Sequence, residues 1–191
     1  MKDSNLYTKP KKQIPVYVAG IGQKTAKLAG AEADGFVTNE LNPKLIEERL
    51  IPAIKEGAKE AGRNYYYSLD KAIFMPASYD EDKQKALQSI GFWKGAMIKA
   101  FFEVDYPDPR KIEESAQVVG NDTLEKMTFV ISNAEDGIKK LEKYIQLGFT
   151  DVVLINSSPE RTKLVRLLAD QIMPAFKDKI SERREDVTYA A

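Results

Sequence analysis

The stretch of residues 15–38, PVYVAGIGQKTAKLAGAEADGFVT, constrains the fold of this chain more than any other segment. It opens with a short apolar, β-branched run that is typical of a strand buried on both faces, as in a parallel sheet. Gly20 and Gly22 then turn the chain into a short predicted helix from Lys24 to Gly30, and the next apolar run begins at Phe36. A strand, a glycine turn and a helix N-terminus present free backbone N–H groups at the positive end of a helix dipole, which favours an anion such as phosphate. A plain strand-to-helix turn, in which the glycines serve only geometry, is the alternative interpretation.

Strands and helices alternate along the rest of the chain. The segments that predict clear strands are Pro15–Ala19, Phe36–Thr38, Lys71–Tyr79 and Thr150–Asn156. The segment TFVIS at 128–132 is compatible with a strand or with a short connector. This alternation predicts an α/β fold with a parallel sheet and right-handed crossovers. An eight-fold βα barrel takes roughly 250 residues, so the 191 residues of this chain accommodate four strand–helix units and not eight.

Local signals predict where several helices begin and end. Asn42 is expected to cap a helix with Pro43 at its first position, and Pro52 is expected to kink that helix. Gly62 is expected to end it. Asn133 predicts the start of another helix, because Asp136 follows three residues later. The helix after the first strand has a small-residue face that is suited to close packing, formed by Ala26, Ala29 and Ala33.

Three further expectations concern the second half of the chain. Asp80 is expected to cap one long helix over residues 81–102, with the sole tryptophan, Trp93, in its buried stripe. Pro76 predicts a bulge or an end within the third strand. The sequence SSPE at 157–160 resembles a capping box for the last helix.

Composition excludes several classes of function. Lys plus Arg equals Asp plus Glu at 29 each, so no overall field attracts the chain to nucleic acid or to an anionic membrane. The chain has no cysteine, which excludes disulfides and thiolate chemistry and fits a cytoplasmic location. It has no histidine, which excludes imidazole acid–base catalysis within this chain. No signal peptide or spanning segment is expected, since no apolar run approaches about 18 residues. We expect one domain, with a lead-in at 1–13, an insertion segment at 104–122 and a charged tail at 177–191.

A resemblance to a known family follows from an ordered series of segments. They are PVYVAG, AKLAGAEADGF, LIPAIKEGAKEAGR, SYDEDKQKALQSIGFW, LEKYIQLGFTDVVL and RLLADQIMPAF. The series, which covers nearly all of residues 6–176, resembles the second half of luciferase-like flavin- or deazaflavin-dependent oxidoreductases. Within that family it is most similar to the deazaflavin-dependent glucose-6-phosphate dehydrogenases. The resemblance implies half of a (β/α)8 TIM-type barrel, strands five to eight, with deazaflavin (coenzyme F-420) or flavin mononucleotide as the cofactor.

The resemblance also implies site residues. In the family, a Gly-Gly-Pro-like turn after the fifth strand holds the cofactor phosphate through its backbone. The residues that correspond to this loop are Gly20, Ile21, Gly22, Gln23 and Lys24. Thr38 matches a substrate-binding threonine of the sugar-phosphate enzymes. The basic residues of those enzymes are replaced here by Leu41 and Glu114, and their final arginine pair falls near Thr162 and Lys163. We therefore expect the cofactor class to be shared and sugar phosphate not to be the substrate.

No catalytic residue can be named from this sequence. The acid–base residues of the family belong to its first four strands, which this chain lacks. Carboxylates remain near strand ends at Asp34, Glu40, Asp80 and Asp151, and each is better explained as a cap or a solvated loop charge than as a catalytic group. The isolated chain is therefore expected to be inactive without the missing half.

Two other roles stay open. The chain is either part of a hydride-transferring oxidoreductase or a non-catalytic half-barrel that binds a phosphate ligand or serves assembly. An unrelated phosphate-binding barrel fragment is the third interpretation. In each case two apolar outer strands, Pro15–Ala19 and Val152–Asn156, predict association with the missing half or with a second copy of the chain. Neither nucleic acid nor a membrane is expected as a partner.

Overall fold

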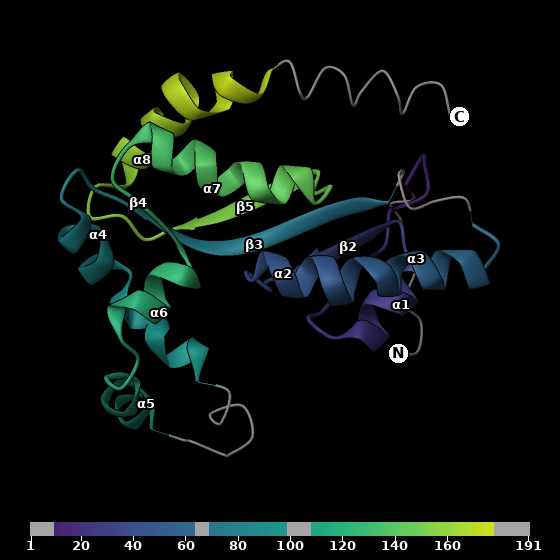
Figure 1. The fold of residues 1–191 in the computed structure, drawn as a ribbon, viewed down its shortest axis with the longest axis horizontal. Coiled ribbons are helices and arrows are strands. Elements are labelled where there is room, and N and C mark those ends of the chain that lie inside the picture. The colour runs from purple at the N-terminus through teal and green to yellow at the C-terminus, as the bar shows by residue number, and fades with distance from the viewer. Residues whose placement is uncertain (1–9, 64–68, 99–107, 178–191) are drawn as a thin grey trace, which may run out of the picture.

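The computed structural model describes residues 10–63, 69–98 and 108–177 (Figure 1). Residues 1–9, 104–107 and 178–191, which belong to the predicted lead-in, insertion segment and tail, lie outside the described residues. The end of the helix predicted over 81–102 also lies outside them.

Five parallel strands form one sheet around a long central strand. The strands are β1 (Tyr17–Ala19), β2 (Gly35–Thr38), β3 (Asp70–Tyr79), β4 (Phe129–Ile131) and β5 (Asp151–Asn156). Ala72 and Ile73 of β3 pair with β2 and with β5 at once, so these two strands flank β3 on opposite edges. Strand β1 pairs with β2. Within the described chain, β1 and β5 therefore lie at the two edges, the short β4 pairs only with β3, and the predicted α/β fold with a parallel sheet is confirmed.

The short strand β4 explains why a proline is tolerated in the middle of β3. Ala77 of β3 pairs with Phe129 of β4 and with Asn156 of β5, so β4 continues the edge that β2 leaves after Ile73. Pro76 lies between these two paired segments, where a missing N–H breaks no ladder bond with β2 or β4. The predicted bulge or strand end at Pro76 is wrong, because β3 continues to Tyr79.

Helices follow each long strand. After β1 and β2 come α1 (Gln23–Glu32), α2 (Pro43–Leu45), the π-helical turn η1 (Ile46–Leu50) and α3 (Ile51–Glu60). After β3 come α4 (Lys83–Ser89), the 3-10 helix η2 (Gly91–Met97), α5 (Pro109–Ala116) and α6 (Asn121–Lys126). The last group is α7 (Ala134–Gln146), α8 (Arg161–Leu167), η4 (Leu168–Ile172) and η5 (Met173–Phe176). In Figure 1, α4, α5 and α6 extend away from the sheet, whereas α3 and α7 run along it.

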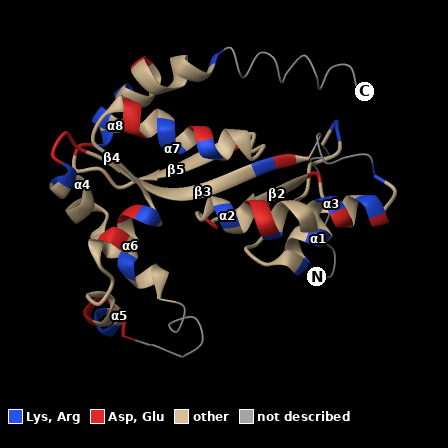
Figure 2. Cartoon of the chain, in the orientation of Figure 1, with Lys and Arg blue, Asp and Glu red and all other residues tan. Residues whose placement is uncertain are grey.

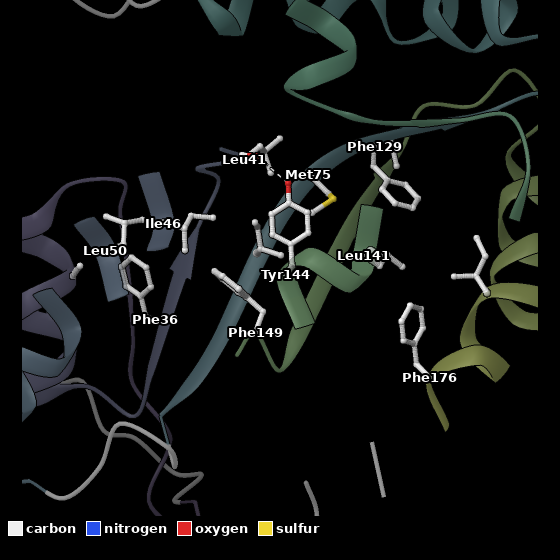
Figure 3. Close-up of a cluster of buried hydrophobic side chains, with 14 of the residues drawn as sticks. Phe36, Leu41, Ile46, Leu50, Met75, Phe129, Leu141, Tyr144, Phe149 and Phe176 are labelled. Carbon is white, nitrogen blue, oxygen red and sulfur yellow. Dashed lines mark hydrogen bonds between the residues drawn. The ribbon is translucent and has the colours of Figure 1, made fainter. Parts of the chain in front are cut away.

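The helices cover one face of the sheet, and the core lies between them and the strands. Ile73 and Met75 of β3 point into this core and are buried, while Phe74 between them is exposed. Figure 3 shows Tyr144 of α7 among the buried side chains, with its hydroxyl donating to the Leu41 carbonyl at 2.9 Å. This bond ties α7 to the loop after β2. Charged residues lie mostly on helices and loops, and most of β3 carries none (Figure 2).

Helices α1 and α3 cross at two glycines. A Cβ on Gly30 would lie 2.0 Å from the Ile54 carbonyl oxygen, and one on Gly57 would lie 1.9 Å from the Lys27 carbonyl oxygen. The backbones touch here because neither residue has a side chain. The predicted small-residue face is thus confirmed, since Ala26, Ala29 and Ala33 are all buried against this crossing. At the rim, the Lys27 ammonium binds Glu56 at 2.9 Å and Glu60 at 2.8 Å.

Several predicted helix boundaries are confirmed. The Asn42 side chain accepts the Lys44 N–H, with Pro43 at the first position of α2. The Asn133 side chain accepts the Asp136 N–H. The π-helical turn η1 lies directly before Pro52, where a kink was expected. Gly62 has φ +67°, as a helix-ending glycine requires.

Two other predicted boundaries are wrong. The residue that caps α4 is Asp82 and not Asp80, and the helix breaks at Ile90 before η2 instead of continuing to residue 102. Residues 157–160 form no capping box, because Glu160 occupies the N-cap position of α8 without a side-chain bond. Instead, the Ser158 hydroxyl accepts the Tyr79 N–H at 2.9 Å. At Ser158 a contact with another part of the chain decided the local structure.

None of the helices within the described residues combines the length and the apolar character that crossing a membrane requires.

Candidate cofactor site at the carboxyl ends of the strands

The loop between β1 and α1 extends the sheet before it turns into the helix. The Gly20 N–H donates to the Val37 carbonyl at 2.9 Å, so the chain stays parallel to β2 until the loop begins. Ile21, Gly22, Gln23 and Lys24 are all exposed. The five residues predicted to hold a phosphate therefore lie together at the carboxyl end of β1, with Gly20 half-buried and the other four open to solvent.

Helix α1 begins without a side-chain cap. Gly22 is its N-cap, and the first intrahelical bond joins the Ala26 N–H to the Gly22 carbonyl at 3.0 Å. The N–H groups of Gln23, Lys24 and Thr25 precede that bond, as at the start of any helix. No acidic residue stands in this first turn. The helix dipole is therefore left uncompensated by the chain itself, which favours an external anion.

The two glycines of this loop have different surroundings. A Cβ on Gly22 would meet nothing within 4 Å, so the space beside this residue is open. A Cβ on Gly20 would lie 2.7 Å from the Thr25 side chain, so Gly20 is required by the turn itself. Open space, backbone N–H donors at a helix start and a nearby lysine together fit a phosphate group. Gly22 is the position at which ligand approach can be tested without disturbing the fold.

The loop after β2 is organised by its own side chains. Thr38 is only 2 % exposed, and its hydroxyl oxygen accepts the Glu40 N–H at 3.1 Å. The Glu40 carboxylate accepts the Asn42 N–H at 2.9 Å. Thr38 thus shapes the loop from the helix-covered side of the sheet, and its predicted contact with a substrate stays a prediction. Leu41 is buried and cannot replace a surface lysine in binding a charged ligand.

Trp93 of η2 and Ser157, which follows β5, are joined at the carboxyl end of the sheet, a pairing that the sequence did not predict. The Trp93 indole N–H donates to the Ser157 hydroxyl at 3.2 Å, and the Ser157 N–H donates to the Ala77 carbonyl at 2.7 Å. The half-buried Trp93 ring is therefore fixed at the carboxyl end of the sheet. Phe92, which is 65 % exposed, lies beside it with ring centroids 5.5 Å apart. The only sequence signal was the position of Ser157 directly after a strand, since the two partners are 64 residues apart.

The carboxylates at strand ends divide between the two ends of the sheet. Glu40 and Asp80 follow β2 and β3, and the Asp80 carboxylate accepts the Asp82 N–H at 2.9 Å. Asp34 and Asp151 lie at the opposite, amino end of the sheet, and the Asp34 carboxylate accepts the Val16 N–H at 2.8 Å. The structure does not bring the four together. In the described part of the chain, no group of three or more His, Cys, Asp or Glu residues is placed to hold a metal ion.

The positions that correspond to the basic sugar-phosphate residues lie apart from the loop. Glu114 is exposed on α5, and Thr162 and Lys163 are exposed on α8. An open depression lies elsewhere, at the start of α7. It is lined by Lys83, Ser132, Asn133, Glu135, Asp136 and Lys139, and none of these belongs to the predicted phosphate loop.

Parallel strands with exposed loops at their carboxyl ends define the class of α/β-barrel proteins in which ligands bind at that end. The luciferase-like monooxygenase family model matches residues 2–151. The chain belongs to the luciferase-like family, which confirms the resemblance noted in the sequence.

Curated relatives share this similarity over about half of their length. The chain is 30 % identical over 176 residues to a glucose-6-phosphate dehydrogenase of Segniliparus rotundus that is F420-dependent, covering 92 % of this chain and 52 % of that enzyme. It is also 30 % identical over 177 residues to the Mycolicibacterium smegmatis enzyme of the same name, again covering 52 % of it. The chain thus spans about half the length of the curated relatives it matches.

Solved structures give the same picture. An F420-dependent secondary alcohol dehydrogenase, in complex with an F420-acetone adduct, superposes with a TM-score of 0.80 at 32 % identity and covers 88 % of this chain and 51 % of that one. The coenzyme F420 dependent tetrahydromethanopterin reductase from Methanopyrus kandleri gives a TM-score of 0.63 at 27 % identity, covering 86 % and 51 %. The predicted half of a TIM-type barrel is thereby confirmed.

Proposed function

We propose that this chain forms the second half of a luciferase-like oxidoreductase that transfers hydride with a deazaflavin or with flavin mononucleotide. Within it, the loop Gly20–Lys24 binds the phosphate of the cofactor. The observation that carries this proposal is the uncapped start of α1 at Gly22, with open space beside it at the carboxyl end of β1. The relatives and the solved structures that are named as F420-dependent support the cofactor class.

The residues of the loop have separable roles in this proposal. The N–H groups of Gln23 and Lys24 donate to phosphate oxygens, and the dipole of α1 stabilises their negative charge. Gly22 lets the phosphate approach the backbone. The Lys24 ammonium adds a long-range attraction that salt screens, because this side chain is exposed. The bound cofactor supplies the hydride chemistry, and the loop fixes its position relative to the strand ends.

The same strand ends provide part of the substrate wall. Trp93 of η2 is bonded to Ser157 after the end of β5, and the loop that begins at Thr38 follows β2. Aromatic and hydroxyl groups suit a small uncharged substrate. Sugar phosphate is not proposed, because Leu41 and Glu114 stand where the sugar-phosphate enzymes carry lysines.

Turnover requires the rest of the barrel. None of the four strand-end carboxylates is paired with another as an acid and a base, so the chain by itself is proposed to bind the cofactor without reducing or oxidising a substrate. A non-catalytic half-barrel that binds a phosphate ligand is the second candidate, and the uncapped α1 start supports it equally.

Binding of the cofactor to paired variants tests the loop. Gly22→Val is expected to weaken binding of a phosphate-bearing deazaflavin at least about tenfold, because a side chain then occupies the approach to the N–H groups. Lys24→Ala is expected to have a smaller, salt-dependent effect. Gly120→Val is the matched control, since Gly120 is also an uncapped helix start with nothing within 4 Å of a Cβ. Fluorescence titration of the cofactor measures all three.

Two outcomes separate the candidates. Equal effects of Gly22→Val and Gly120→Val would show that the loop is only a turn. Tight binding of the cofactor together with no turnover after the barrel has been completed would favour the non-catalytic half-barrel.

A further inference from the structure

Ile21 is an exposed apolar side chain within the loop that is proposed to bind phosphate. Its side chain is 62 % exposed, although it directly precedes Gly22, the N-cap of α1. Gly20, on its other side, is fixed by the bond from its N–H to the Val37 carbonyl and by the close Thr25 side chain. Among the five residues of the loop, Ile21 alone has an apolar side chain. The loop therefore presents one apolar group beside the N–H donors at the start of α1.

The charges around this loop are nearly balanced. Lys24 is the lysine of the first turn of α1, and its side chain is exposed. The next lysine of the helix, Lys27, is engaged by Glu56 and Glu60 of α3. The adjoining loop after β2 carries the half-buried carboxylate of Glu40. The remaining attraction for an anion is the partial charge of the helix end, about half an elementary charge, which suits a singly charged group.

The two cofactors present different phosphates to such a loop. The side chain of coenzyme F-420 contains a phosphodiester, which carries one negative charge and has carbon on both sides. Flavin mononucleotide ends in a phosphomonoester, which carries a charge of about −1.5 to −2 at pH 7 and whose terminal oxygens all accept hydrogen bonds. A charged oxygen that faces an apolar side chain loses hydrogen bonds to water and gains none in return. The carbon next to a diester oxygen can instead pack against that side chain.

We infer that Ile21 makes this loop selective for a phosphodiester over a phosphomonoester, and hence for a deazaflavin over flavin mononucleotide. The inference rests on the proposed function, because it concerns the same phosphate site. The N–H groups of Gln23 and Lys24 donate to the unesterified oxygens, while Ile21 packs against the ester carbon and excludes water from that side. A phosphomonoester needs a further donor or cation at the place that Ile21 occupies.

Three deazaflavins that differ only at the end of the ribityl chain isolate the contribution of the phosphate. One ends in a hydroxyl, one in a phosphomonoester and one in a methyl phosphodiester, and fluorescence titration in phosphate-free buffer measures their affinity for the full chain. We expect the phosphodiester to bind at least about tenfold more tightly than the hydroxyl compound, through charge-assisted hydrogen bonds. The phosphomonoester should gain less than about threefold, because one of its charged oxygens lacks a partner.

Substitutions at Ile21 test whether this residue sets the preference. Ile21→Lys should strengthen binding of the phosphomonoester at least about fivefold, because it supplies the missing cation, and should abolish the preference for the diester. Ile21→Gly should reduce the preference to within about threefold by removing the apolar contact. Val118→Lys is the matched control, since Val118 is 83 % exposed after α5, and it should leave the ratio of the two affinities within about twofold. Circular dichroism verifies that each variant is folded.

The contrary outcomes distinguish the inference from the proposed function. A phosphomonoester that binds the unaltered chain as tightly as the phosphodiester would overturn the inference and leave the phosphate site in place. A preference that Ile21→Lys leaves unchanged, or that Val118→Lys alters as much, would overturn it in the same way. If neither phosphate compound binds more tightly than the hydroxyl compound, the loop binds no phosphate, and the proposed function is refuted together with the inference.

Discussion

Replacing either glycine at the crossing of α1 and α3 should destabilise the protein sharply. In Gly30→Ala, the new Cβ lies 2.0 Å from the Ile54 carbonyl oxygen, whereas ordinary contact begins at 3.4 Å. The two helices must therefore separate by about 1.4 Å along that direction, which removes dispersion contacts along the whole small-residue face. Forced overpacking costs about 1–3 kcal/mol, and the obstruction here is backbone that cannot rotate away.

The net effect is smaller than the steric cost, because alanine favours a helix over glycine by about 1 kcal/mol. With a steric cost near the top of its range, about 3 kcal/mol, and a gain of about 1 kcal/mol from alanine, we expect a net loss of about 2 kcal/mol in the free energy of unfolding. For a chain of this size that corresponds to a fall of roughly 4–8 °C in the melting temperature. Thermal and urea denaturation followed by circular dichroism measure it.

Two controls separate a steric effect from glycine chemistry. In Gly137→Ala the Cβ meets the side-chain tips of Ile172 at 2.6 Å and of Ile131 at 3.2 Å and no backbone, and in Gly91→Ala it meets nothing within 4 Å. By the same reasoning, each of these substitutions should lower the free energy of unfolding by less than about 1 kcal/mol. Gly30→Ala combined with Gly57→Ala should cost less than the sum of the two, because one separation of the helices relieves both clashes. Equal costs at Gly30 and Gly91, or strict additivity at the crossing, would refute the reasoning.

Three further predictions concern hydrogen bonds between distant segments. Tyr144→Phe leaves the buried carbonyl after β2 without its donor and should lower the free energy of unfolding by about 1–2 kcal/mol in urea denaturation, whereas no change would mean that water replaces the hydroxyl. The pKa of Tyr17 is raised from 10.0 to about 12, chiefly by the hydrogen bond to Asp70, so the stability that this bond contributes is present below pH 10 and is lost as the pH rises through 12. Tyr17→Phe should therefore make the free energy of unfolding less sensitive to pH across that window. Parallel curves of unfolding free energy against pH for the two proteins would contradict this. Ser157→Ala should shift the emission of the sole tryptophan, with little change in the melting temperature, and an unchanged spectrum would show that this bond does not fix the indole.

The sequence by itself determined the elements whose signals are local. Alternating apolar runs predicted the strands and the parallel sheet, since a strand buried on both faces needs few polar residues. Asn42 and Asn133 predicted helix starts correctly because a cap bonds a backbone N–H only two or three residues away. The loop and helix start after β1 were predicted for the same reason, as a strand, a glycine turn and a helix start lie within one short stretch, and phosphate binding there stays a prediction.

Only the tertiary structure decided the features that depend on residues far apart in the chain. Pro76 was predicted to interrupt β3, but β2 and β4 leave a gap on that edge, and no local signal records a gap between partners. Residues 157–160 were predicted to form a capping box for α8, yet the Ser158 hydroxyl accepts the N–H of Tyr79, 79 residues away, because the folded sheet brings the ends of β3 and β5 together. The apolar face of the sheet that exposes Phe74 and Val153 likewise belongs to the assembled sheet. An uninterrupted apolar run predicts that both faces of a strand are apolar, and only the packed structure shows which of the two the helices cover.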